Sequence, residues 1–451
     1  MAEKSESRLS AVKRAVEALP AFEVYGRVAA VRGLLIEIAG PVAAMHVGGR
    51  IEIETGRGGM VPCEVIGFSG ERALAMPFGA LAGVRRGCPA HVRDEIVGVR
   101  PSRGWLGRVV DALGRPIDGK GPLPQGPAVR PFRADPPPAH ARRRVGAPLD
   151  LGVRAMNTFL TVCAGQRMGI FSGSGIGKSV LLSMFARYTA ADVAVIGLVG
   201  ERGREVQEFL QDDLGEEGLA RSIVVVATSD EPALMRRNAA YLSLALSEHF
   251  QDEGAAVLCL IDSITRFAMA QRDIGLAGGE PPTAKGYTPT VFNELPRLLE
   301  RAGPGTGAGT ITGMFTVLVE GDDHNEPIAD AARSILDGHV TLDRRLATSG
   351  HFPSIDVLGS VSRVVGFVTT PEQRRQANLL RRVLAAHRDA KDLIEVGAYA
   401  PGSNPDLDAA VALSPAITAF LRQPVDETLD ANASWQQLAA LTGALAQVGA
   451  A

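Results

Sequence analysis

Residues 172–182 read SGSGIGKSVLL, and this stretch decides the fold. It follows the apolar run RMGIFS at 167–172 and leads into an apolar segment of helical length. Glycines at 173, 175 and 177 let the backbone curl so that its N–H groups point at one anion, and the helix N-terminus adds partial positive charge. A strand, a glycine-rich turn and a helix in this order predict a phosphate-binding loop.

The side chains of this loop indicate which phosphate compound it binds. Lys178 supplies a point charge for the β and γ phosphates of a nucleotide, and Ser179 is placed to ligate Mg²⁺. The usual pattern, GxxxxGK[ST], starts with glycine, whereas Ser172 takes that position here. We therefore expect ATP and Mg²⁺ to bind. The predicted binding residues are Gly173, Ser174, Gly175, Ile176, Gly177, Lys178, Ser179 and Val180.

The chain around this loop alternates between strand-like runs and segments of helical length. The strand-like runs are at 167–172, 193–199, 223–227, 257–262 and 311–319. This alternation predicts an α/β fold in which a largely parallel sheet is covered by helices.

Two acidic residues are predicted at the carboxyl edge of that sheet, where ligands bind in such folds. Asp262 ends the run VLCLID and is a Walker-B-type acid for Mg²⁺, although it could also cap the next helix. Glu201 follows another strand and can orient and polarise an attacking water. Arg202 and Arg266 lie near the same edge, where each could contact the γ-phosphate or form a structural ion pair.

Other parts of the chain have a different texture. Leu9, Val12, Val16 and Leu19 fall at helical spacing, so this first helix packs on its own domain or binds a partner. Short β-rich runs broken by Gly and Pro then predict a small barrel. The expected divisions are a helix at 1–20, a barrel at 21–95, a surface connector at 96–145, an ATPase domain at 146–370 and a helical domain at 371–451.

Bulk composition excludes several classes of protein. The 451 residues carry a net charge of -3, which argues against nucleic-acid binding because that function needs a basic surface. No apolar run approaches the roughly 20 residues of a membrane span. The four cysteines lie far apart and the N-terminus is too polar for a signal peptide, which favours the cytoplasm.

Several motifs together resemble the catalytic subunits of rotary ATPases and the type III secretion ATPases. They are SGSGIGKS, GERGRE and IDSITRF, with GRVVDALGRPIDG ahead of the nucleotide domain. The stretches GEPPTAKGYTPTVFNELPRLLERAG and GHFPSIDVLGSVSRVV are similar to the secretion branch, and TFLTVCAGQRMGIFSGSGIGKSVLLSM is most similar to its flagellar members. The resemblance covers about residues 25–420.

The resemblance implies a RecA-like P-loop NTPase core with a parallel sheet, a small N-terminal β-barrel and a C-terminal helical domain. Arg363 falls on the position of an arginine finger that reaches the neighbouring subunit's γ-phosphate, and Phe352 on an aromatic that stacks on adenine. The loop at 275–289 matches one that lines a central pore, with an ordinary surface loop as the alternative.

The resemblance also implies partners. We expect a homo-oligomer, a hexameric ring, that energises flagellar protein export. A stator-like regulator would bind the first helix. A central stalk protein, an export gate, export substrates and chaperones would be further partners, at the cytoplasmic face of the inner membrane. The alternatives are an injectisome ATPase, an ATP synthase subunit, a ring helicase and a non-catalytic ring subunit. The presence of Lys178, Glu201, Asp262 and Arg363 together argues against the last of these.

Overall fold

The computed structural model describes residues 23–56, 58–93, 97–319, 326–400, 402 and 404–448. The chain divides into two compact units, one from residues up to 97 with 276–279, and the other from the remaining residues. The helix predicted at 1–20 lies outside the described residues, so its partner binding stays a prediction. Along the described residues, no helix is both long and apolar enough to cross a lipid bilayer.

The first unit contains the predicted small β-barrel, which closes in the order β1-β2-β5-β4-β3-β6. Alternate residues point inward, so that Ile36 and Ile38 on one strand meet Ile51 and Ile53 on another in a fully buried core. The strands are β1 (Tyr25–Arg32), β2 (Leu35–Ala39), β3 (Arg50–Glu54), β4 (Met60–Ser69), β5 (Arg72–Pro77) and β6 (Pro89–Arg93).

The second unit is built on a nine-stranded sheet with the order β19-β18-β12-β17-β15-β13-β14-β8, in which β16 pairs with β17. All neighbours are parallel except β19 on β18 and β16 on β17. The strands are β8 (Arg108–Asp111), β12 (Arg167–Ser172), β13 (Val193–Glu201), β14 (Ser222–Thr228), β15 (Ala256–Asp262), β16 (Gly303–Pro304), β17 (Thr310–Leu318), β18 (Gly338–Leu342) and β19 (Ile355–Ser362).

One segment differs from the sequence-based expectation. Residues 96–145 were expected to form a surface connector, but Arg108–Asp111 joins the sheet as β8, a parallel neighbour of β14. Arg108 donates two hydrogen bonds to the Asp118 carboxylate, at 2.7 and 2.9 Å. This ion pair lets a strand carrying a charged first residue lie buried at the edge of the sheet.

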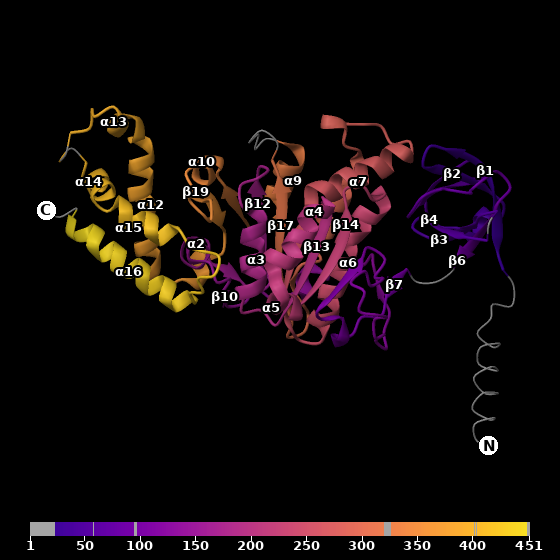
Figure 1. Ribbon diagram of the computed structural model, residues 1–451, viewed down its shortest axis with the longest axis horizontal. Helices are drawn as coiled ribbons and strands as arrows, with labels where there is room; N and C mark the ends of the chain where they lie inside the picture. The colour runs from indigo at the N-terminus through magenta and orange to yellow at the C-terminus, as the bar shows by residue number, and fades with distance from the viewer. Residues whose placement is uncertain are drawn as a thin grey trace, which may run out of the picture. The chain divides into compact units, whose positions relative to one another are not determined.

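Helices cover both faces of this sheet, as Figure 1 shows. Alternate residues of β13 face opposite ways, and Ile196 and Leu198 share a buried core with Leu181 of α3. On the other face, a Cβ on Gly197 would lie 2.4 Å from the Ser243 Oγ of α6, so only glycine fits there. The helices around the sheet are α2 (Arg154–Phe159), α3 (Lys178–Tyr188), α4 (Gly203–Glu208), α5 (Gly215–Ala220), α6 (Ala233–Asp252), α7 (Ile264–Ala277), α8 (Pro289–Leu299), α9 (Pro327–Ile335), α10 (Arg344–Thr348) and α11 (Val365–Val368).

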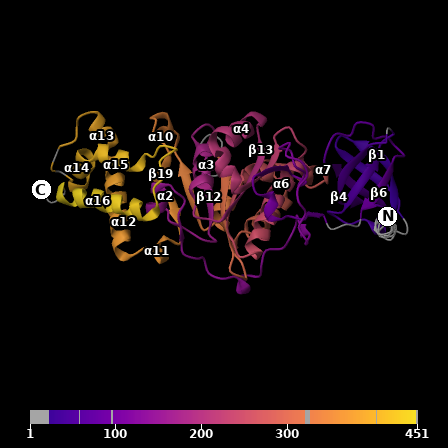
Figure 2. The same cartoon turned by 60° about the horizontal axis from the view of Figure 1, so that its bottom comes forward.

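The chain after residue 370 is helical, as predicted. These helices lie together in both views (Figures 1 and 2) and pack on α2 and β19. Leu380, Leu407 and Leu438 are buried in one core with the α3 side of the sheet. The helices are α12 (Pro371–Asp389), α13 (Lys391–Glu395), α14 (Pro405–Ala412), α15 (Ser414–Leu421) and α16 (Ala431–Val448).

Candidate active site

The phosphate loop lies where the sequence places it, between the end of β12 at Ser172 and the start of α3 at Lys178. Gly175 and Gly177 have φ of +74° and +84°, a region that glycine adopts without strain. A Cβ on Gly177 would also lie 3.1 Å from the ring of Phe352. The loop conformation therefore requires glycine at both positions, and it opens the helix N-terminus toward an anion.

Three charged side chains meet next to this loop. The Lys178 ammonium lies 2.5 Å from Asp262 Oδ1 and 3.3 Å from Glu201 Oε1. Asp262 ends β15 and Glu201 ends β13, so parallel strands deliver both carboxylates to the same edge of the sheet. All three residues are predicted from the sequence, and the structure brings them together.

The environment shifts the pKa of two of these groups. Burial raises the pKa of Glu201 to about 7, and the nearby Asp262 carboxylate adds to this effect while Lys178 opposes it. Burial would lower the pKa of Lys178, but the Asp262 and Glu201 carboxylates hold it above its ordinary value. A carboxyl group whose pKa lies near neutrality suits a residue that takes a proton from water.

Three further side chains contact Asp262 or the phosphate loop, and the sequence did not identify them. The Thr316 hydroxyl donates to Asp262 Oδ1 at 2.7 Å, and the Ser354 hydroxyl donates to the Ile176 carbonyl of the loop at 2.7 Å. Arg344 donates to the Ser174 carbonyl at 3.2 Å. Hydroxyl groups and arginines on strands and loops are too common for sequence spacing to single out these three.

The two arginines near this edge differ in their surroundings. The Arg266 side chain packs over Gly200, where an added Cβ would lie 2.9 Å from the Arg266 Cβ. Its Nε is buried and makes no hydrogen bond within the described residues. Arg202, in contrast, is exposed and pairs with Glu205 at 3.0 Å. The structure thus places Arg266 directly against the backbone that leads to Glu201, and turns Arg202 toward an ion pair on the surface.

Phe352 and Arg363 stand at opposite ends of β19. Phe352 precedes the strand, with its ring against Gly177 and 45% of the residue exposed. Arg363 follows the strand, is exposed, and donates from its backbone to the Asp337 carbonyl at 3.0 Å. Asp337 in turn pairs with Arg167, the first residue of β12.

Arg363 therefore lies at the amino ends of the parallel strands, and its own phosphate loop lies at their carboxyl ends. Residues 167–172 of β12 separate the two, and six residues at about 3.3 Å each span roughly 20 Å. An arginine side chain cannot bridge that length, so within one chain Arg363 does not reach the site formed by Lys178, Glu201 and Asp262.

A parallel sheet with a glycine-rich phosphate loop and a lysine between two carboxylates defines a P-loop nucleotide hydrolase. Comparison with known families agrees. The profile of the ATP synthase alpha/beta family, nucleotide-binding domain, matches residues 152–362. The profile of the T3SS EscN ATPase C-terminal domain matches residues 369–440.

Curated relatives extend over nearly the full chain. The Flagellum-specific ATP synthase of Caulobacter vibrioides is 56% identical over 430 residues, covering 94% of this chain and 97% of the relative. That of Bacillus subtilis is 48% identical, covering 95% and 97%. The Type 3 secretion system ATPase of Xanthomonas euvesicatoria is 46% identical, covering 89% and 90%. The chain belongs to the family of flagellum-specific and type III secretion ATPases.

A solved structure shows the same fold. The assembled ATPase EscN from the enteropathogenic E. coli type III secretion system superposes with a TM-score of 0.85 at 38% identity, covering 92% of this chain and 99% of EscN. EscN in complex with its central stalk EscO matches equally well. The predicted fold class and the predicted family are both confirmed.

Proposed function

We propose that this chain hydrolyses Mg-ATP at the interfaces of a homo-oligomeric ring and thereby energises protein export through the flagellar type III secretion apparatus. The ring is supported by the position of Arg363. It lies at the amino ends of the parallel strands, whereas the phosphate loop lies at their carboxyl ends. One chain holds both the phosphate loop and Arg363, but it cannot bring them together. A complete site therefore forms between two copies. Head-to-tail contacts of this kind close into a ring.

The residues at the site fit a nucleotide with Mg²⁺. The loop needs glycine at 175 and 177, and the exposed face of Phe352 beside Gly177 suits stacking on adenine. Ser179 in the first turn of α3 and Asp262 at the end of β15 would hold the metal. Bound Mg²⁺ would neutralise charge on the phosphate oxygens.

The chain's own residues then divide the work of hydrolysis. Lys178 holds the β and γ phosphates by its charge. Glu201 orients a water molecule and takes its proton as the water oxygen bonds to the γ-phosphorus and the bond to ADP breaks. Arg363 of one copy stabilises the charge that develops on the γ-phosphate held by the next, and Arg266 lies close enough to the Glu201 strand end to assist.

Partners follow from the relatives rather than from this chain alone. The structure of EscN with its central stalk EscO supports a stalk partner for this ring as well. We include in the proposal a regulator at residues 1–20, and contacts with an export gate, export substrates and chaperones at the cytoplasmic face of the inner membrane. The flagellar role is favoured over the injectisome role by the 56% identity to a flagellum-specific relative.

Two measurements test this function. The first follows ATP turnover per chain against protein concentration, together with particle mass, with and without nucleotide. Turnover should rise as rings form, and full activity in a confirmed monomer would contradict the proposal. The second replaces the chain in its own cells by Glu201→Gln and measures flagellar filament protein in the medium. Export should stop, and normal export would contradict the flagellar role.

A further inference from the structure

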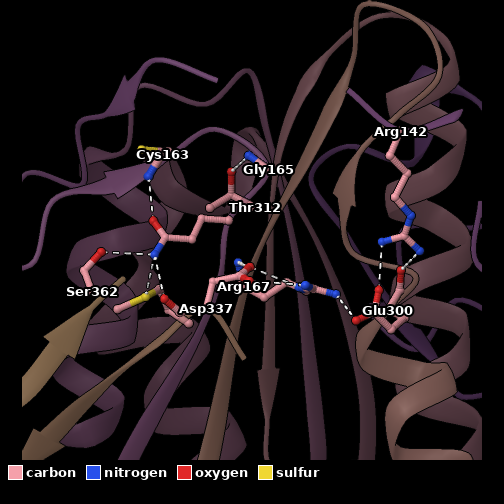
Figure 3. Close-up of polar contacts among 10 residues, drawn as sticks. Arg142, Cys163, Gly165, Arg167, Glu300, Thr312, Asp337 and Ser362 are labelled. Carbon is pink, nitrogen blue, oxygen red and sulfur yellow. Dashed lines mark hydrogen bonds and ion pairs between the residues drawn. The ribbon is translucent and has the colours of Figure 1, made fainter. Parts of the chain in front are cut away.

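A polar network, partly buried, joins Ser362, the residue before Arg363, to the start of β12 (Figure 3). The backbone N–H of Arg363 donates to the Asp337 carbonyl at 3.0 Å. The residue before it, Ser362, accepts a hydrogen bond from Gln166 Nε2 at 3.1 Å and donates to the Thr161 carbonyl at 3.0 Å. The Ser362 side chain and the Arg363 N–H thus fix the backbone on either side of the peptide bond between these two residues.

Gln166 is the centre of this network. It is fully buried, and its Oε1 accepts the Cys163 N–H at 2.9 Å. Its Nε2 also approaches the Asp337 carbonyl at 3.4 Å, the same atom that receives the Arg363 N–H. The Gln166 amide therefore contacts both Ser362 and the Asp337 carbonyl, which accepts the Arg363 N–H. Buried hydrogen-bond networks whose members are paired hold a single geometry.

The Asp337 carboxylate anchors the network to the sheet. It receives Arg167 Nε at 3.1 Å and Arg167 Nη2 at 3.2 Å, in a fork geometry that fixes direction as well as distance. Arg167 also pairs with Glu300, which Arg142 holds at 2.9 Å from the other side, as Figure 3 shows. These ion pairs link Asp337 through Arg167 to Glu300, and none of them involves the exposed Arg363 side chain.

The backbone at this point leaves little room for movement. A Cβ on Gly338 would lie 2.5 Å from the Val361 carbonyl, so β18 and β19 approach closely just before Arg363. The Arg363 guanidinium itself is exposed, and among the residues that the structure describes it donates one side-chain hydrogen bond, to the Arg333 carbonyl at 3.2 Å. A firmly held backbone beneath an exposed guanidinium suits a side chain that acts on a ligand outside its own chain.

We propose that Ser362 and Gln166 are positioning residues that hold Arg363 for the neighbouring subunit's γ-phosphate. This rests on the proposed function, because it requires Arg363 to act in trans. The two residues do not touch the substrate and act only through Arg363. Loss of the Ser362 hydroxyl would let the Arg363 backbone shift, and a misplacement of about 1 Å can cost on the order of 100-fold in rate.

The test uses Ser362→Ala in the full chain. Homogeneous rings of this variant should lose about 10- to 100-fold in kcat. Their affinity for nucleotide should stay at the wild-type value, because the phosphate loop is untouched. Ser362→Thr keeps a hydroxyl and should recover most of the rate. If Ser362→Ala does not fold, the nearly isosteric Ser362→Cys takes its place, since a thiol is only a weak hydrogen-bonding group.

Ser360→Ala is the matched control. Ser360 lies two residues earlier on β19, is also buried, and bonds to the Asp356 carbonyl and the Thr341 N–H instead of Gln166. It should keep kcat near the wild-type value. An equal loss of kcat in both alanine variants would mean that general weakening of β19 is responsible, and would overturn the positioning role.

Mixed rings decide which site the damage affects. Ser362→Ala mixed with Lys178→Ala should regain activity, because one chain supplies the phosphate loop and the other an intact Arg363. Ser362→Ala mixed with Arg363→Ala should not, because neither chain presents Arg363 correctly. Rescue in the second mixture would place the damage in the variant's own phosphate loop and would overturn the inference.

The reference mixture of Lys178→Ala with Arg363→Ala distinguishes a failure of the trans role of Arg363 from a failure of the positioning role of Ser362. If this mixture shows no rescue although mixed rings form, Arg363 does not act in trans, and both the proposed function of Arg363 and the positioning role fall. If this mixture is rescued while Ser362→Ala rings turn over at the wild-type rate, only the positioning role is refuted.

Discussion

Lys178 is the residue on which the site depends most directly. Its ammonium lies between Asp262 and Glu201, which keep it charged. We expect Lys178→Ala to lower kcat/KM by at least about 100-fold, because the phosphates lose a fixed charge in a partly buried site. Steady-state phosphate release measures this. Lys391→Ala, which removes an exposed lysine paired with Glu395, is the control and should leave the rate unchanged. Near-normal turnover in Lys178→Ala would remove this lysine from the site.

Glu201 separates binding from chemistry. Glu201→Gln keeps the shape of the side chain but cannot take a proton from water, so nucleotide should bind normally while kcat falls by at least about 100-fold. Equilibrium nucleotide binding and single-turnover hydrolysis check this. The control is Glu208→Gln, because Glu208 forms an exposed pair with Arg204. A fall in affinity as steep as the fall in kcat would show that Glu201 serves the structure instead.

The raised pKa of Glu201 also predicts a pH dependence of stability. Between the ordinary carboxyl pKa, near 4.5, and about 7, the folded state binds more protons at this group than the unfolded state. Ionised Glu201 therefore costs stability as pH rises through this window, and the full cost is present above about pH 7. In metal-free protein, the thermal midpoint of Glu201→Gln should exceed that of the wild type at pH 8, and the excess should shrink at pH 5. A lower midpoint for the variant at pH 8 would contradict this.

At the scale of elements, the sequence predicts best where the hydrophobic pattern is continuous. The predicted strands at 167–172, 193–199, 223–227, 257–262 and 311–319 correspond to β12, β13, β14, β15 and β17. These are central strands buried on both faces, which read as unbroken apolar runs. Their ends also place Glu201 and Asp262, so the core of the site follows from the same pattern.

The edges of the sheet could not be predicted in the same way. The strand β8 has only four residues and starts with Arg108, inside a segment rich in Pro and Gly. Its burial depends on Asp118, ten residues later, and no local pattern reports such a pair. At the other edge β19 is antiparallel, and this direction places Phe352 and Arg363 at opposite ends. Strand direction is a tertiary property, so the family resemblance pointed to both residues but not to their places at opposite ends of one strand.

The Arg108–Asp118 pair makes β8 a testable element. The Asp118 carboxylate also accepts the N–H groups of Val109 and Lys120. Its bond to Arg108 and these N–H groups hold the pKa of Asp118 well below its usual range, so the pair stabilises the fold above about pH 4 and loses this effect as pH falls further. Asp118→Asn should cost about 1–3 kcal/mol in unfolding free energy at pH 7 and less near pH 3.

Denaturant unfolding at the two pH values measures the effect of Asp118→Asn. The matched control is Asp426→Asn, because the Asp426 side chain is 91% exposed and should contribute little. An equal loss for both variants, or a loss for Asp118→Asn that does not diminish at low pH, would show that the pair does not hold β8.

At the scale of the whole molecule, β19 connects two sites. At its start, Ser354 donates to the Ile176 carbonyl of the chain's own phosphate loop. At its end, Arg363 is presented away from that loop. In a ring, one strand would then contact the nucleotide site of its own chain at one end and the site of the neighbour at the other. Mutual dependence of the subunits would follow from this geometry.

The proposed ring requires Arg363 of one copy to complete the site of a neighbouring copy. Arg363→Ala alone should lose about 10³-fold or more in kcat, the range seen when a transition-state arginine is removed. The most direct measurement is ATP turnover in mixed rings of Lys178→Ala and Arg363→Ala, with each variant alone as the reference. We expect both variants to be nearly inactive alone, and we expect mixing to restore part of the activity, with a larger gain at higher total protein concentration. Rings shown to contain both chains but without any regained turnover would contradict it.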